Sequence, residues 1–149
     1  MNAAKYEITP KLLDALYVEA MILADEARSY FDRGPVAGAL SPMASVAFSC
    51  ESLKVTTRLM HSIAWLLNQK AVRAGEISAA DMDSEARQLG YAPASDPFLT
   101  GQFPDDAREI VRTSEDLYYR LQRISEGLRS QYQSPPEPIR LREKIMQAF

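Results

Sequence analysis

Few residues in this chain of 149 have side chains suited to catalysis, and their spacing matches no catalytic set. His61 is the only histidine and Cys50 the only cysteine. A G-x-S-x-G nucleophile turn is absent, and so is the paired Glu-x-x-His of a di-iron bundle. The Cys and His counts exclude clustered zinc ligands. We therefore predict no catalytic, cofactor-binding or metal-binding residues, and expect His61 to be an ordinary helix-surface or interface residue.

Four cations leave a metabolite-binding alternative open. Small helical dimers of the chorismate-mutase type bind a dianion with buried Arg and Lys side chains from several helices. Such a set could be drawn from Arg28, Lys54, Arg58 and Arg120. The simpler expectation is that these cations lie on solvated faces with partners one turn away, such as Asp116 for Arg120. A pocket lined by several cations would favour the enzyme.

Composition and charge exclude other classes of function. The net charge is −3 and no block of Lys and Arg occurs, so direct nucleic-acid binding is not expected. Purely apolar runs such as 63–67 are far shorter than the roughly 20 residues that span a bilayer. Residues 1–7 have no apolar stretch behind their single lysine, so they do not resemble a secretory signal. We expect a cytoplasmic protein without a membrane segment.

Helix signals dominate the chain, and no stretch shows the alternation typical of strands. Thr9-Pro10 predicts the start of a helix over 10–32, which Gly34-Pro35 ends. Pro104 and two aspartates predict another helix over 104–132. Apolar residues three and four apart place one seam on each helix. The seams are Leu13, Leu16, Ala20, Leu23, Ala27 and Tyr30, and Ile110, Ser114, Leu117, Leu121, Ile124 and Leu128.

A third long helix is predicted over 42–74, from Ser41-Pro42 to Gly75. One row has heptad spacing: Val46, Cys50, Leu53, Thr57, Met60, Ala64, Leu67 and Ala71. A second apolar set lies beside it: Phe48, Val55, Leu59, Ile63 and Leu66. A helix so poor in charge is either central to the domain or in contact with a second subunit, so we expect a homodimer. Cys50 is expected to be a buried structural thiol.

The charged residues of this helix share one face, because Glu51, Lys54 and Arg58 recur every three or four residues. Unpaired buried charges are costly, so these groups need water or a partner. We predict that they form part of a partner-binding surface or an ion network between helices. A simple solvent-facing stripe is the alternative.

The remaining segments are short. A Ser78-x-x-Asp81 pattern predicts a short helix to about residue 89, and 91–103 is expected to be a loop. Three prolines at 135–138 predict a flexible tail over 133–149, whose apolar residues would contact a partner. These are Ile139, Leu141, Ile145, Met146 and Phe149. The fold class is therefore all-α, an antiparallel three-helix bundle over 1–132 with one short extra helix and a flexible C-terminal tail.

The stretch 47–76 resembles the central helix of the alphaproteobacterial RcdA family, the regulators of CtrA degradation. Two pieces carry the resemblance: Glu-Ser-x-x-x-Thr-Thr-Arg-Leu-Met at 51–60, and Trp-Leu-Leu-x-Gln-Lys-Ala-Val at 65–72. The segment 103–111, Phe-Pro-Asp-Asp-Ala-Arg-Glu-Ile-Val, is a weaker match. The match covers about a fifth of the chain strongly and most of it loosely.

The resemblance implies a homodimeric helical bundle without enzyme activity. It implies an accessory adaptor that helps the ClpXP protease degrade cell-cycle regulators, and whose partners are the protease–adaptor complex and its cargo. No binding motif transfers residue by residue, and the cargo is not identified. Two other functions remain open: a helical enzyme or metabolite binder that uses buried Arg and Lys, and a plain dimerisation module.

Overall fold

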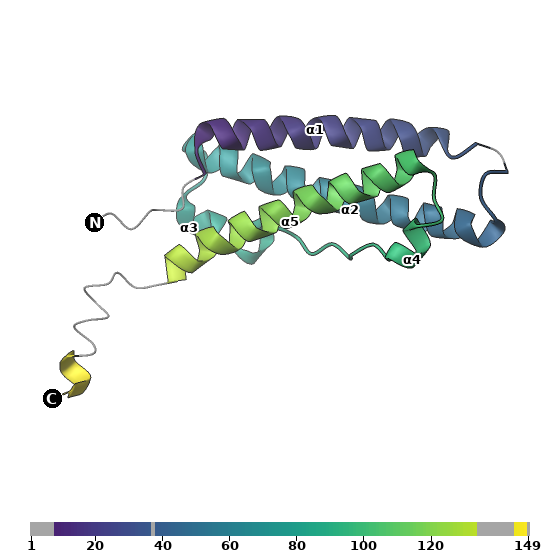
Figure 1. Ribbon diagram of the computed structural model, residues 1–149. Coiled ribbons are helices and arrows are strands. Elements are labelled where there is room, and N and C mark those ends of the chain that lie inside the picture. Colours follow the sequence, from purple (N-terminus) through teal and green to yellow (C-terminus); the bar gives the residue numbers. More distant parts are fainter. Residues whose placement is uncertain (1–7, 37, 134–144, 149) are drawn as a thin grey trace.

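The computed structural model describes residues 8–36, 38–133 and 145–148, and these contain helices and connections but no strand. Three long helices dominate: α1 (Pro10–Arg33), α2 (Pro42–Arg73) and α5 (Asp105–Gln133). Between α2 and α5 lie α3 (Ala79–Met82), a 3₁₀ turn (Glu85–Arg87) and α4 (Pro97–Thr100). Figure 1 shows the long helices packed side by side as a bundle. The predicted all-α class is confirmed, and each long helix begins and ends within one residue of its prediction.

The predicted caps fix where α1 and α2 begin. The Thr9 hydroxyl accepts a hydrogen bond from the Leu12 amide at 3.1 Å, and the Ser41 hydroxyl accepts one from the Ala44 amide at 3.2 Å. Each cap is followed by proline, whose missing N–H costs nothing in the first turn. Gly34 ends α1 with φ +68°, a conformation that other residues rarely adopt.

Helix α1 runs antiparallel to both other long helices, but α2 and α5 run parallel to each other (Figure 1). The predicted antiparallel arrangement is therefore wrong for this one pair. Arg58 of α2 lies beside Ser114 of α5, and Trp65 further along α2 lines the same pocket as Ser125 further along α5. The reason is the long connection over 74–104, which returns along the bundle before α5 begins.

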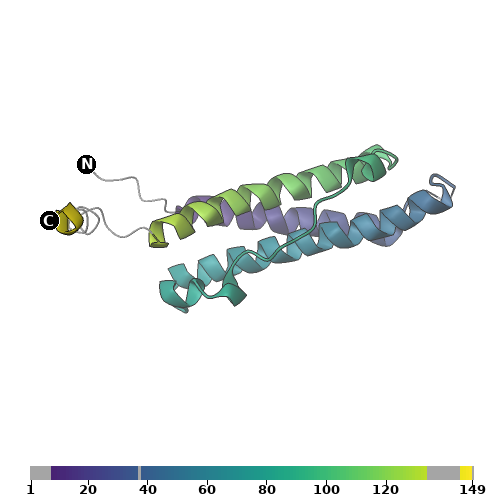
Figure 2. The same cartoon turned by 90° about the horizontal axis from the view of Figure 1, so that it is seen from below.

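The second half of this connection crosses the bundle as a strap, defined here as residues 88–104. Figure 2 shows it passing over the face formed by α2 and α5, between the end of α2 and the beginning of α5. The predicted short helix over 78–89 is divided into α3 and the 3₁₀ turn, and the predicted loop contains α4. The carboxylate of Asp96 starts α4 by accepting a hydrogen bond from the Phe98 amide at 2.9 Å.

The core lies between the three long helices. The predicted seam of α1 is buried apart from the partly buried Tyr30, and Ile110, Leu117 and Leu121 fill the α5 side. At the end where α1 turns into α2, Phe48 forms aromatic contacts with Phe31 and Phe103, with ring centroids 5.3 and 5.4 Å apart. These contacts join α1 and α2 to the end of the strap.

Helix α2 has two apolar rows, and the row with heptad spacing faces outward rather than into the core. Phe48, Val55, Leu59 and Leu66 are buried, whereas the heptad row is largely exposed. We call its first seven residues the outer row: Val46, Cys50, Leu53, Thr57, Met60, Ala64 and Leu67. Cys50 is accordingly exposed, so its predicted burial is wrong. Periodicity alone could not choose between rows of similar spacing, and the bulkier set, which lies beside Trp65, occupies the core.

Gly90 allows the strap to lie directly against His61. A Cβ atom built at Gly90 would be 2.6 Å from Nδ1 of the imidazole. His61 is thus half-buried under the strap, and its Nδ1 atom has no hydrogen-bond partner among the described residues.

We predict that Gly90→Ala lowers the free energy of unfolding by about 1–3 kcal/mol, because the added methyl group displaces the imidazole or the strap. Denaturant unfolding followed by circular dichroism measures this loss. His61→Ala in the same chain should recover most of it, because the two sites are in contact. If the losses in free energy of unfolding of the two single variants simply added in the double variant, the close contact between Gly90 and His61 would be contradicted.

Candidate partner-binding surfaces

Arg58 connects three segments from inside the protein. Its residue is 1% exposed, although it carries a charge. One guanidinium nitrogen donates a hydrogen bond to the Ser114 hydroxyl at 3.1 Å, which joins α2 to α5. Another donates to the Pro93 carbonyl at 3.2 Å and to the Ser95 hydroxyl, which joins α2 to the strap. The planar fork of arginine suits several acceptors at once, so Arg58 fastens the strap over α2 and α5.

Tyr118 of α5 holds the strap at a second point. Its hydroxyl donates a hydrogen bond to the Gly90 carbonyl at 2.8 Å and accepts one from the Ala92 amide at 3.1 Å. Side chains of the bundle thus satisfy three backbone groups in the irregular part of the strap, at Gly90, Ala92 and Pro93. The ring of Tyr118 is buried in the bundle, so the residue also serves core packing. Its hydroxyl role depends on the path of the strap, which no local pattern indicates.

Glu51 and Lys54 form the rest of the polar stripe. Glu51 is 1% exposed, and its Oε1 accepts a hydrogen bond from Nζ of Lys54 at 2.8 Å. The other carboxylate oxygen is buried without a hydrogen-bond partner among the described residues. The stripe is therefore largely interior. Only Lys54, whose side chain is 28% exposed, reaches solvent appreciably.

The structure shows where some of the predicted partner-binding residues lie, but it does not test whether they bind a partner. Glu51 and Arg58 lie inside the bundle, so a simple solvent-facing stripe does not describe them. Glu51 pairs with Lys54 within α2, and Arg58 bonds neutral groups of α5 and the strap. In the predicted tail, Ile145 and Met146 lie in a helical turn over 145–148 and are 53% and 73% exposed. Ile139, Leu141 and Phe149 fall outside the described residues. Partner binding by either group stays a prediction.

The four cations considered for a metabolite site do not converge. Arg28 lies on the surface, where a guanidinium nitrogen is 3.6 Å from a carboxylate oxygen of Asp25. Arg58 donates its hydrogen bonds to the strap and to α5. Arg120 pairs with Glu19 of α1, so the expected partner Asp116 is wrong; Asp116 instead lies 3.0 Å from Arg112. Each cation has its own partner, and none of the four lines either of the two pockets described below.

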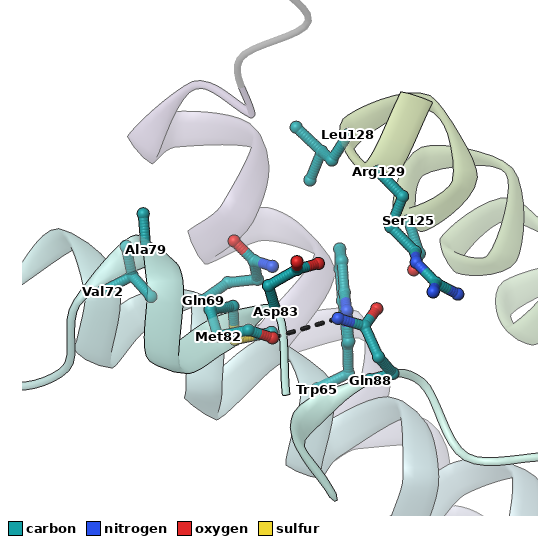
Figure 3. A pocket seen from close by; sticks show the side chains of 10 residues that line it. All are labelled: Trp65, Gln69, Val72, Ala79, Met82, Asp83, Gln88, Ser125, Leu128 and Arg129. Carbon is teal, nitrogen blue, oxygen red and sulfur yellow. Dashed lines mark hydrogen bonds between the residues drawn. The ribbon is translucent and has the colours of Figure 1, made fainter. Parts of the chain in front are cut away.

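A small pocket lies at the end of the bundle where α2 and α5 finish (Figure 3). Trp65, Met82 and Leu128 line its apolar side, while Asp83 and Arg129 bring one charge of each sign. Its volume of about 70 Å³ is well below the roughly 300–1,000 Å³ of sites that enclose small-molecule ligands. It has room for one small side chain rather than a metabolite.

The described residues give little support for other kinds of chemical site. Among the described residues, no three His, Cys, Asp or Glu side chains gather closely enough to hold a metal ion. In the same part of the chain, no helix is long and apolar enough to cross a membrane. Burial and the nearby Asp106 carboxylate raise the pKa of Tyr30, which lies beside Phe31 and Phe48 rather than in a polar cleft.

The outer row of α2 is an apolar surface that no described residue covers. Val46, Leu53 and Met60 are 66%, 67% and 64% exposed, and Leu67 is 47% exposed. They recur every seven residues, which aligns them along a single face. Several large exposed apolar groups in one line are typical of a surface that another protein covers.

Comparisons with known proteins agree with this architecture. The chain matches the family described as "Protein of unknown function (DUF1465)" over residues 4–149. A solved structure, RcdA from Caulobacter crescentus CB15, is 30% identical to it with a TM-score of 0.61. That match covers 85% of this chain and 96% of the Caulobacter chain. The chain belongs to the RcdA family. No curated protein matches it significantly.

The motifs that resemble RcdA combine interior and surface positions of α2. In the segment 51–60, Glu51 and Arg58 are buried, whereas Met60 belongs to the outer row. In the segment 65–72, Trp65 and Leu66 are buried, whereas Leu67 is exposed. The RcdA-like pattern thus includes both the fastening of the strap and the outer row.

We predict that Arg58→Ala lowers the free energy of unfolding by about 3 kcal/mol, because it removes charge-assisted hydrogen bonds and leaves a cavity. Arg58→Lys should also destabilise the protein, because an ammonium group cannot reproduce the planar fork. Arg123, an exposed residue of α5 without an ion pair to a described residue, provides the control. Denaturant unfolding should show Arg123→Ala within about 0.5 kcal/mol of the parent. If Arg58→Ala and Arg123→Ala lowered the free energy of unfolding by similar amounts, the fastening role of Arg58 would be contradicted.

Proposed function

We propose that this chain is a non-catalytic, homodimeric adaptor that assists ClpXP in the regulated proteolysis of cell-cycle regulators in the cytoplasm. The proposal draws on the resemblance to the RcdA family, of which the chain is a member. The observation that carries it in the structure is the exposed outer row of α2, which lies on the very helix that holds the RcdA-like motifs.

The polar chemistry of the chain supports a binding role rather than a catalytic one. Arg58 and Glu51 are buried, and Arg120 pairs across helices, so these groups serve the internal structure. The small pocket contains one arginine and one aspartate, whereas a site for a dianion would need several cations. The large apolar side chains of the outer row, in contrast, are exposed.

A second copy is our proposed occupant of the outer row. Heptad-spaced apolar side chains on one helix pair well with an identical row related by a twofold axis. The row itself contains no charged residue, so twofold pairing would not bury like charges against one another. The dimer would present two copies of every other surface to the remaining partners.

The adaptor proposal is tested in a reconstituted degradation reaction with ClpXP from the same organism and a candidate cell-cycle regulator as cargo. The full chain should raise the rate of cargo degradation and should cleave nothing without ClpXP. Gel electrophoresis over time measures both rates. If the dimer forms but no tested regulator is degraded faster, the plain dimerisation module becomes the better interpretation.

We predict that Leu53→Glu separates the homodimer, because it places two carboxylates in an apolar contact between subunits. Light scattering at micromolar concentration should give twice 16.7 kDa for the parent chain and 16.7 kDa for the variant. Val36→Glu is the matched control, since Val36 is 82% exposed but lies in the connection between α1 and α2. A parent chain of monomer mass would contradict the proposed dimer.

We further predict that truncation after Ser134 leaves the melting temperature unchanged but removes the stimulation of ClpXP. The physical reason is that the part beyond the last proline, 139–149, has only 11 residues. It is too short for a stable isolated helix and would order on a partner. Differential scanning calorimetry and the degradation reaction provide the two measurements. A truncated chain that melts several degrees lower would show that the tail serves the fold instead.

A further inference from the structure

A second apolar surface lies along α1, beside the first half of α5. It is an open groove of about 640 Å³, lined almost entirely by α1, with Thr113 of α5 at one side. Ala15, Val18, Ile22 and Leu23 supply its apolar residues. Val18 is 54% exposed and Ile22 is 62% exposed, while Leu23 is buried and continues into the core. The groove therefore offers an apolar row without a covering element in the described structure.

Only negative charges line this groove. Its ionisable residues are Asp14, Glu19 and Glu26, and no lysine or arginine is among the lining residues. Asp14 accepts a hydrogen bond from Nζ of Lys70 at 2.7 Å, and Glu19 pairs with Arg120. Glu26 has no ion pair or side-chain hydrogen bond with a described residue. Its carboxylate is thus available to a cation from outside.

The α5 side adds no free cation near Thr113. Arg112 lies between Glu109 and Asp116, and both carboxylates bind it. The hydrogen bond from Arg112 lowers the pKa of Glu109, so this carboxylate stays ionised at neutral pH. The groove is therefore bordered on both helices by groups whose summed charge is negative.

We propose that this groove binds an amphipathic helix of a protein partner, one whose apolar face is flanked by lysine or arginine. The inference deepens the proposed adaptor function, and rests on it in assuming a protein partner. Glu19 and Glu26 are seven residues apart, which is about 10.5 Å along α1. In a partner helix with cations at the same interval, one cation would pair with the free Glu26 carboxylate and the next would face Glu19, which Arg120 already pairs. The apolar residues of the partner between these cations would cover Val18 and Ile22.

The charge of the groove argues against other occupants. A second copy related by a twofold axis would place Glu19 and Glu26 opposite carboxylates of the same kind, which is unfavourable in a partly desolvated contact. Nucleic-acid phosphates and anionic lipid head groups would meet the same repulsion. The outer row of α2 lacks these charges, so the two surfaces suit different partners.

The test uses the full chain and a fluorescent peptide of about 18 residues, with leucines along one helical face and lysines seven residues apart beside them. Saturable binding is expected from fluorescence anisotropy, with an affinity that falls as salt rises. A matched peptide with glutamate in place of lysine should bind at least about tenfold more weakly. In NMR spectra, the amide shifts caused by the lysine peptide should cluster along 14–26 and at Thr113.

Variants of single exposed residues assign the binding to the groove. Glu26→Lys and Ile22→Asp should each weaken binding of the lysine peptide about tenfold or more. Asp32→Lys makes the same charge change at an exposed position of α1 outside the groove, and should alter the affinity less than about twofold. Circular dichroism confirms that each variant is folded.

Equal affinities for Glu26→Lys and Asp32→Lys would overturn the proposal, as would amide shifts confined to the outer row. The degradation reaction with ClpXP is measured separately. A chain that binds the peptide in the groove but does not stimulate ClpXP supports the groove and contradicts the adaptor role. A chain that stimulates ClpXP but gives no groove-dependent peptide binding contradicts the groove alone.

Discussion

The arrangement of this protein depends on one constraint: α2 and α5 run parallel, so the chain must return along the whole bundle between them. The return is made by the strap, which has little regular secondary structure and therefore needs hydrogen-bond partners from elsewhere. Arg58 and Tyr118 provide them. Arg58 contacts α5 and the strap at once, and Tyr118 satisfies the Gly90 carbonyl and the Ala92 amide. Burying a guanidinium group is costly, and several good acceptors offset that cost. Gly90 completes the contact because any larger residue would meet His61.

This constraint also determines which surfaces remain open. The strap covers the side of α2 that carries Arg58, and Glu51 is buried as well, so the charged stripe is used inside the protein. The outer row of α2 and the groove along α1 are left without a covering element in the described structure. The two differ in chemistry, since the outer row is uncharged and the groove is lined by carboxylates. A homodimer through the first and a basic helix in the second are compatible, and together they would suit a protein that brings other proteins together.

Much of the fold could be predicted from local signals. Thr9-Pro10, Ser41-Pro42 and Gly34 act within one turn of their own position, so the helix ends follow from the sequence. The seams of α1 and α5 also follow, because each helix has one clear apolar face. Helix α2 has two, and spacing could not show which faces the core, so Cys50 was misplaced. The direction of α5 relative to α2 depends on the path of a long connection, and the roles of Tyr118 and Ser95 depend on that path. The groove was missed because its acidic and apolar residues, read along α1, resemble an ordinary solvated face.

The central claim is that buried polar side chains hold the strap across α2 and α5 and so leave the apolar surfaces free for partners. The most direct measurement is residue-resolved hydrogen exchange by NMR at the Ala92 amide, whose acceptor is the Tyr118 hydroxyl. The account predicts that this amide exchanges far more slowly than in an unstructured peptide, close to the rate of the core amides of α5. It also predicts that Tyr118→Phe makes this amide exchange rapidly while the α5 amides stay protected. An Ala92 amide that exchanges at the rate of a free peptide in the parent protein would contradict the account.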